Sequence, residues 1–219
     1  MSIAKSIENN LDIVKFNYYH KCMGRKNYHH GNLKEELVES GMQILREEGI
    51  SALTLRSTAR KAGVSHSAPY AHFIDKQALL AAISTRGFRD LYQRLDEVIN
   101  AYANSPESLL LETGWAYAQF ALAEPALFKL MFSGMLEDEH SHPEFVAAAR
   151  VTYQNLVGVV AICQSAGLLR TGPSDHGAVA IWSMVHGFIS LFLERQLPGQ
   201  AIEGADLKTL LGNSLAHLT

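Results

Sequence analysis

The sequence predicts an all-α protein, with a small N-terminal helix-turn-helix three-helix domain followed by a larger helical bundle. Three observations favour this fold class. Hydrophobic residues make up 47% of the 219 residues and recur at helical spacing, with few alternating β-branched runs. Proline and glycine separate these apolar segments. A short stretch near the N-terminus, residues 53–76, has the pattern of two short helices joined by a tight turn.

This stretch reads LTLRSTARKAGVSHSAPYAHFIDK. Thr54 is a suitable N-cap, and Leu55 to Lys61 supply about two helical turns. Gly63 breaks the helix, because glycine tolerates the left-handed conformation at which helices end. Ser65 is a second N-cap candidate and opens a helix that we expect to run through Tyr70 to Phe73. Two helices joined in this way form the motif whose second helix enters the DNA major groove.

Flanking helices are predicted from the same signals. Asn32 caps a helix that runs to Glu48 and ends at Gly49. A long helix begins at Lys76 and ends near Asn100. The body begins at Pro106, and its predicted segments are 109–122, 126–132, 143–166, 175–196 and 207–218.

Charge is divided unevenly along the chain. Residues 1–76 carry a balance of +3 and the remainder a balance of −6, which together give the net charge of −3. This division suits a DNA-facing N-terminal part and an acidic body. The two cysteines, Cys22 and Cys163, indicate a reducing compartment. The apolar run 178–193 is shorter than the roughly 20 residues of a membrane span, so we expect a cytoplasmic protein without a membrane partner.

The motif T-L-R-x-x-A-x-x-A-G-V-S-x-x-A-P-Y-x-H-F-x-D-K-x-x-L-L, from Thr54 to Leu80, resembles the DNA-binding domain of tetracycline-repressor (TetR) family regulators. In the C-terminal half, Trp182, His186 and Gly187 form W-x-x-x-H-G, which resembles the W-H-G carboxy-terminal domain of some members. The resemblance implies a homodimer that binds double-stranded operator DNA, most simply as a repressor, and releases it when a small effector binds the body. We divide the chain into a disordered tail at 1–24, a helix-turn-helix domain at 25–76 and a ligand-binding and dimerisation domain at 77–219.

Chemistry assigns roles within the expected DNA-binding domain. Side chains at the start of the second helix meet base edges, where serine and histidine exchange hydrogen bonds and alanine contacts a thymine methyl. The candidates are Ser65, His66, Ser67 and Ala68. The resemblance and the positions of the remaining polar side chains imply backbone contacts for Thr54, Arg56, Tyr70, His72 and Lys76, and for Arg25 and Lys26 in an N-terminal arm.

The body has two expected roles. The segment 178–193 is apolar nearly all round, so we expect burial on two sides, by its own chain and by a partner. The expected dimer interface contains Trp182, His186, Gly187, Leu207 and Leu211. Aromatic and methionine side chains are mostly core, but the resemblance implies a ligand pocket among Trp115, Phe120, Phe128, Met131, Tyr153, Trp182 and His186, with Glu112, Tyr117 and Arg150 as polar partners.

Two other function classes stay open. A ligand-sensing interaction protein without DNA binding is one. A metal-dependent hydrolase using His140 and His142 is the other, but these histidines share one polar loop with no fixed geometry. The sequence contains neither a G-x-S-x-G elbow nor a phosphate-binding G-x-x-x-x-G-K-[ST] loop. We therefore expect no enzyme activity, no cofactor and no metal.

Overall fold

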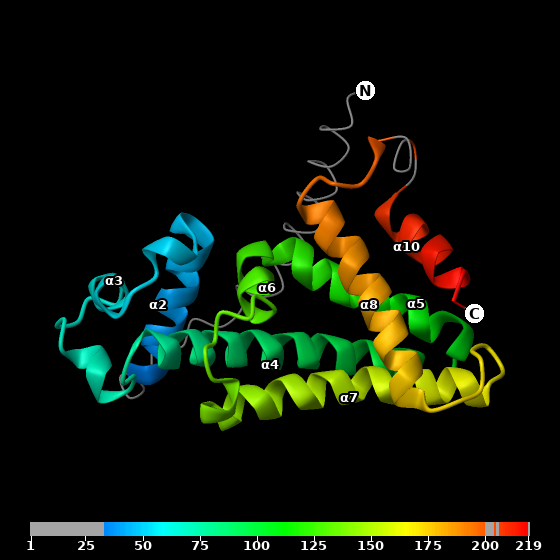
Figure 1. Ribbon diagram of the computed structural model, residues 1–219, viewed down its shortest axis with the longest axis horizontal. Coiled ribbons are helices and arrows are strands. Elements are labelled where there is room, and N and C mark those ends of the chain that lie inside the picture. The colour runs from blue at the N-terminus through cyan, green and yellow to red at the C-terminus, as the bar shows by residue number, and fades with distance from the viewer. Residues whose placement is uncertain (1–32, 200–203, 205, 219) are drawn as a thin grey trace. The chain divides into compact units, whose positions relative to one another are not determined.

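The computed structural model describes residues 33–199, 204 and 206–218, and within them it contains helices, turns and loops but no strand. Figure 1 shows the helices. The elements are α2 (Leu33–Glu48), η1 (Ile50–Ala52), α3 (Leu55–Lys61), η2 (Ala68–Ala71), α4 (Lys76–Tyr102), α5 (Pro106–Ala123), α6 (Pro125–Met131), η3 (Glu139–Ser141), α7 (Pro143–Ser165), α8 (Ser174–Leu193) and α10 (Leu207–Ala216). The all-α prediction is confirmed. The predicted tail at 1–24 and the Asn32 cap lie outside the described residues.

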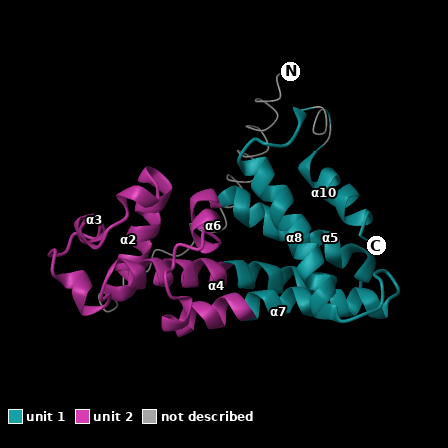
Figure 2. Cartoon of the chain, viewed as in Figure 1, with its two compact units in different colours: residues 1–23, 91–123, 151–219 teal, residues 24–90, 124–150 magenta. Residues whose placement is uncertain are grey.

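The chain forms two compact units, each assembled from separate parts of the sequence (Figure 2). Among the described residues, one unit contains residues 33–90 and 124–150, and we call it the head unit. The other contains residues 91–123 and the described residues from 151 onward, and we call it the body unit. Helices α4 and α7 each contribute residues to both units. The predicted domain boundary at 76 stays a prediction.

Local signals fix the ends of α3. The Thr54 side chain accepts a hydrogen bond from the Ser57 N–H at 3.0 Å, and the Ser57 hydroxyl accepts one from the Thr54 N–H at 2.9 Å, which is a capping box. At the other end Gly63 has φ +70°. There the Gly63 N–H donates to Arg60 O and the Val64 N–H donates to Ala59 O, the pattern of a Schellman motif. The predicted helix 55–61 and its glycine stop are both confirmed.

The core of the head unit packs α2 under α3, η2 and the start of α4. Its fully buried side chains include Leu37, Ile44, Leu45, Leu53, Phe73, Leu79, Leu80 and Ile83. Lys61 of α3 also forms a 2.6 Å ion pair with Glu47 of α2. Because α3 and η2 are short, their orientation depends on this packing rather than on their own stability as helices.

The body unit packs α5, α8 and α10 together (Figure 1). A Cβ added to Gly114 of α5 would lie 3.6–3.8 Å from Leu215, Leu211 and Val185, so these three helices meet at ordinary van der Waals distance. The side chains of Leu207, Leu211 and Leu215 are all buried here. On α8 the buried residues follow one stripe: Ala178, Ile181, Val185, Ile189 and Phe192.

The opposite side of α8 is only partly covered within one chain. Val179 is 51% exposed and Leu191 is 47% exposed, and a Cβ added to Gly187 would have no atom within 4 Å. We call this side, defined by Val179, Ser183, Gly187 and Leu191, the outer face of α8.

Helices α7 and α8 are long and apolar enough to cross a membrane by length and composition alone. This is weak evidence for a membrane span, because core helices of soluble proteins meet the same test.

Candidate nucleic-acid interface and aromatic cluster

The side chains expected to contact DNA lie on the surface of the head unit. Thr54, Arg56, Ser65, His66, Ser67, Tyr70, His72 and Lys76 are exposed, and Ala68 is half-buried. Tyr70 is 62% exposed, so its ring is not part of the core, whereas Phe73 is 2% exposed and packs inside. Arg25 and Lys26 lie outside the described residues. The assignment of these residues to base or phosphate contacts stays a prediction.

The second helix of the motif differs from the expected one. In place of an α-helix capped by Ser65, the chain forms turns followed by the 3₁₀ helix η2 over Ala68–Ala71. Pro69 explains the difference, because it has no N–H with which to bond Ser65 O in α-helical fashion. The Ala68 N–H donates to Ser65 O instead, at 3.0 Å. The Ser65 and Ser67 hydroxyls lie 3.1 Å apart.

Two features beside this turn were not predicted. Ile74 is 86% exposed between the turn and α4. Asp75 caps α4 by accepting a 2.8 Å hydrogen bond from the Ala78 N–H. The start of a helix can offer its free N–H groups to phosphate, and at α4 the Asp75 carboxylate takes one of them. Aspartate just before a helical run is the sequence signal for this cap.

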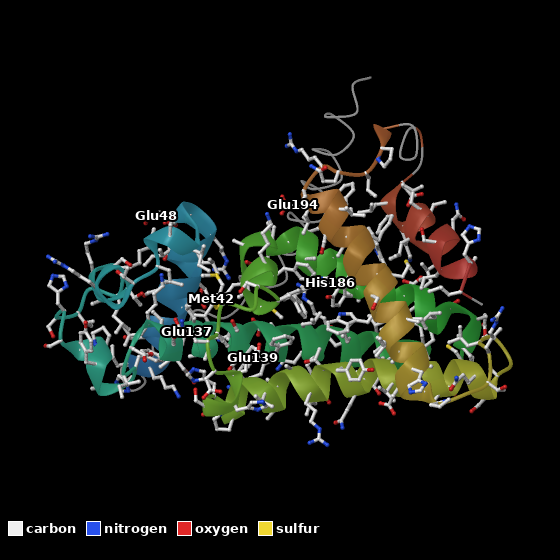
Figure 3. The ribbon with its side chains drawn as sticks, in the orientation of Figure 1. Met42, Glu48, Glu137, Glu139, His186 and Glu194 are labelled. Carbon is white, nitrogen blue, oxygen red and sulfur yellow. The ribbon has the colours of Figure 1, made fainter. Side chains whose placement is uncertain are left out.

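In the body unit, α5 and α8 join through three polar aromatic side chains, which we call the aromatic cluster: Tyr117, Trp182 and His186. Figure 3 labels His186 on α8. Trp182 Nε1–H donates to the Tyr117 hydroxyl oxygen at 3.3 Å. Tyr117 Oη lies 2.7 Å from His186 Nδ1. Trp182 can only donate, whereas the donor in the Tyr117–His186 hydrogen bond depends on the histidine tautomer.

Burial governs the ionisation of this cluster. It raises the pKa of Tyr117 well above its usual value, and the hydrogen bond from Trp182 offsets only part of that rise. Burial also lowers the pKa of His186, because the imidazolium would lose hydration. Near neutral pH the cluster is therefore an uncharged chain of hydrogen bonds, with a neutral His186.

Some of the side chains expected to line a ligand pocket lie near one another, and the pocket itself stays a prediction. Tyr153 lies edge-on to Trp182 with ring centroids 6.0 Å apart, beside the aromatic cluster. Phe120 is fully buried in the body unit, and Trp115 there is half-buried. Phe128 and Met131 belong to the head unit, where Phe128 contacts Phe132 at 5.1 Å between centroids.

Of the expected polar partners, Tyr117 is in the cluster itself. Glu112 instead forms a 2.6 Å ion pair with Lys208 of α10, so its carboxylate is committed to holding α10 on α5. Arg150 is exposed and belongs to the head unit.

The expected dimer residues separate into two groups. Leu207 is 3% exposed and Leu211 is 0% exposed inside one chain, because α10 packs on α5 and α8. This burial shows that their own chain already covers both leucines, and their assignment to a dimer interface stays a prediction. Gly187, by contrast, is on the outer face of α8 with open space around its Cα. Trp182 and His186 are half-buried in the aromatic cluster.

The loop before α7 carries His140 and His142 beside several carboxylates. Residues 137–141 are exposed, and Figure 3 labels Glu137 and Glu139 on this loop. Within the described part of the chain, no group of three or more His, Cys, Asp or Glu side chains is placed to hold a metal ion.

Comparison with known proteins places both parts of the chain in one family. Residues 34–83 match the family model described as bacterial regulatory proteins, tetR family. Residues 110–212 match the model described as a tetracyclin repressor-like C-terminal domain. An uncharacterised HTH-type transcriptional regulator of Bacillus subtilis, YobS, is 22% identical over 161 residues, which cover 74% of this chain and 79% of YobS.

Solved structures share the fold. A protein of unknown function from Rhodococcus sp. RHA1 is 29% identical with a TM-score of 0.75, covering 89% of this chain and 97% of that one. The TetR family transcriptional regulator PfmR from Thermus thermophilus is 18% identical with a TM-score of 0.61, covering 83% and 96%. The two family matches agree with the exposed helix-turn-helix side chains and the capped α3. This chain belongs to the TetR family of DNA-binding transcriptional regulators.

Proposed function

We propose that this protein is a homodimeric repressor that leaves its operator when a small apolar or aromatic effector binds in the body unit. The observation that carries the proposal is the exposed turn 65–72, held between the capped α3 and the buried Phe73. It presents serine, histidine and tyrosine side chains that can form hydrogen bonds with base edges or with phosphate groups of DNA. We place the protein in the cytoplasm with its DNA.

The outer face of α8 supports the dimer. An apolar helix that is covered on one side only leaves apolar surface in water, and burying this surface against a second copy is favourable. Gly187 allows the backbone of a partner helix to approach closely. A two-fold dimer would present two heads to half-sites in successive major grooves, so we expect a palindromic operator.

The aromatic cluster supports the effector response. It places a few hydrogen-bonding groups among apolar side chains, which is the chemistry of small-molecule sites. The effector must bind the DNA-free conformation more tightly than the DNA-bound one, since a ligand with equal affinity for both shifts nothing. An apolar molecule with one hydrogen-bonding group matches the chemistry of the aromatic cluster.

The first test is a titration of the purified protein against the DNA upstream of its own gene, in a salt series. We expect two chains to bind per duplex and affinity to fall steeply with salt, because each phosphate contact releases a counterion. A panel of apolar and aromatic compounds is then tested for release of that duplex. Failure to bind either this duplex or any member of a random-site library contradicts the repressor.

Head substitutions separate backbone contacts from base contacts. Lys76→Ala or Tyr70→Ala is expected to weaken binding to every duplex, and Lys76→Ala to reduce the salt slope by about one unit. His66→Ala is expected to shift sequence preference, with about 1–3 kcal/mol lost at the base pair that it reads. Site selection from a random library measures both effects. An unchanged preference in His66→Ala contradicts the base contact.

The aromatic cluster predicts a pH dependence of stability. The pKa of His186 is lowered in the folded protein, whereas an unfolded histidine titrates near about 6.5. As pH falls through this value the unfolded chain binds the proton more readily, so the contribution of His186 to stability is present above about pH 6.5 and lost below it.

His186→Asn is the matched variant, because asparagine keeps an acceptor for Tyr117 but does not titrate. Thermal unfolding from pH 8 to pH 5 should show a smaller fall in the midpoint for this variant than for the wild type. If the thermal midpoint falls equally with pH in the two proteins, His186 does not cause the pH dependence of stability.

A further inference from the structure

The chain passes between the two compact units at three places within residues 33–199. Two lie inside continuous helices, after Asp90 in α4 and after Arg150 in α7. The third lies between Ala123, the last residue of α5, and Glu124, which precedes α6. At this third crossing the helix is interrupted, and Glu124 has φ −126° and ψ 58°. A crossing between two helices can change direction more easily than one inside a helix.

Glu124 is tied to the helix that supports the DNA-reading motif. Its side chain is 1% exposed, and its Oε2 accepts a 2.8 Å hydrogen bond from Nε of Arg46, near the end of α2. The other oxygen, Oε1, is buried and has no hydrogen-bond partner in the described structure. A buried carboxylate that depends on one cation is costly to separate from it. The position of Glu124 and the position of α2 are therefore linked.

Among the residues that the structure describes, Arg46 has a second carboxylate partner, whereas Glu124 pairs with one cation. Arg46 Nη1 lies 3.4 Å from Oε1 of Glu39, a residue that is 58% exposed. Burial lowers the pKa of Arg46, but the hydrogen bond and charge of Glu124, followed by those of Glu39, outweigh this effect and raise it above its usual value. If Glu124 moves, the arginine keeps Glu39 and contact with water. Separating the pair would therefore leave the buried Glu124 carboxylate, and not Arg46, without a compensating charge.

Helix α6 also contacts α4 closely. A Cβ added to Gly87 of α4 would lie 2.5 Å from Sδ of Met131 and 3.2 Å from Cδ1 of Leu127, both on α6. There is no room for a side chain at this contact unless Met131 shifts. Helix α6 thus packs against α4 at Gly87. It also contacts α2, whose Arg46 forms the ion pair with Glu124. These two helices precede and follow the DNA-reading motif in the sequence.

We propose that Glu124 is a positioning residue, which transmits the conformation of α5 through Arg46 to α2 and the DNA-reading motif. Helix α5 carries Tyr117 of the aromatic cluster and leads directly into Glu124, so a change at the cluster reaches the head unit through this crossing. The inference rests on the proposed effector response and names the residue through which it acts.

Thermodynamic linkage provides a test that needs no effector. If α5 influences the head, DNA binding to the head must influence α5 by the same free energy. The probe is a duplex selected by this protein from a random-sequence library, added to the full-length chain. Amide hydrogen exchange is followed in α5 and in α3 with and without the duplex. We expect the duplex to slow exchange in both helices of the wild type.

Glu124→Gln removes the negative charge that pairs with Arg46. We expect the duplex to slow exchange in α3 of this variant as before, while the slowing in α5 falls by about half or more. A merely structural role would lower the thermal midpoint but leave the response of α5 to DNA intact. The matched control is Glu144→Gln, because Glu144 also pairs with α2 and α4, through Lys34 and Arg89, but is 64% exposed. Such exposed pairs hold weakly, so this control should behave as the wild type.

The double variant Glu124→Gln with Arg46→Met keeps the proposal testable if the single variant does not fold. Replacing both members of a buried pair leaves no uncompensated charge and is often tolerated. It should fold and also lose the response of α5. A wild type that binds the duplex without any change in α5, or a folded variant that keeps the full response, overturns the role of Glu124. A wild type that binds no duplex overturns the repressor itself, and this inference with it.

Discussion

Gly187→Glu is expected to separate the dimer and to weaken binding to a palindromic duplex by about 10²- to 10⁴-fold, the gain that linking two binding modules provides. Open space surrounds Gly187 in one chain, so the new side chain fits the monomer. In a two-fold interface the introduced carboxylate lies near its own copy, and burial of two like charges opposes association. Sedimentation gives the mass in solution, and duplex titration at fixed salt gives the affinity.

Gly158→Glu on α7 is the matched control. Like Gly187, Gly158 is helical and has no atom within 4 Å of an added Cβ, so this variant adds the same charge at another open position, one that is exposed in the single chain. It should remain dimeric and bind the duplex as the wild type does. A Gly187→Glu protein that stays dimeric would place the interface elsewhere than on the outer face of α8.

Leu211→Ala is expected to lower the free energy of unfolding by about 2–5 kcal/mol, the usual cost of removing a buried leucine side chain. Leu211 is fully buried among α5, α8 and α10 inside a single chain. Its loss should therefore destabilise the protein at every protein concentration. Urea unfolding at several concentrations separates this effect from one on association.

Leu191→Ala removes the same side chain from the outer face of α8, where the leucine is 47% exposed. We expect a small effect on the single chain, within about 0.5 kcal/mol, and a larger one that depends on protein concentration. If Leu211→Ala instead shows the concentration dependence and Leu191→Ala does not, α10 lies between chains, as its apolar spacing alone would also allow.

The parts predictable from sequence are those fixed by neighbouring residues. The cap at Thr54 and the stop at Gly63 follow from side-chain and backbone chemistry within a few positions, and both are confirmed. Pro69 is a sequence signal against a regular α-helix, because proline has no N–H to donate. The resemblance of residues 54–80 to a helix-turn-helix domain instead predicts an α-helix there. The turn is therefore expected as an α-helix and is a 3₁₀ helix.

Pairing between distant residues was not predictable. Helical spacing shows that Leu207 and Leu211 are buried, but it does not say whether their own chain or a partner covers them. Glu124 and Arg46 are 78 residues apart, and nothing local to either marks them as partners. The aromatic cluster was predictable only in part. The W-x-x-x-H-G motif contains Trp182 and His186, but only the fold brings Tyr117 into contact with them.

The outer face of α8 has a consequence for how much protein the cell must make. A single chain leaves this apolar surface in water, so chains below the dissociation constant of the proposed dimer remain unpaired and hold only one head each. In that range the amount of dimer rises with the square of the amount of chain. Occupancy of the operator would then respond steeply to the protein's own synthesis rate.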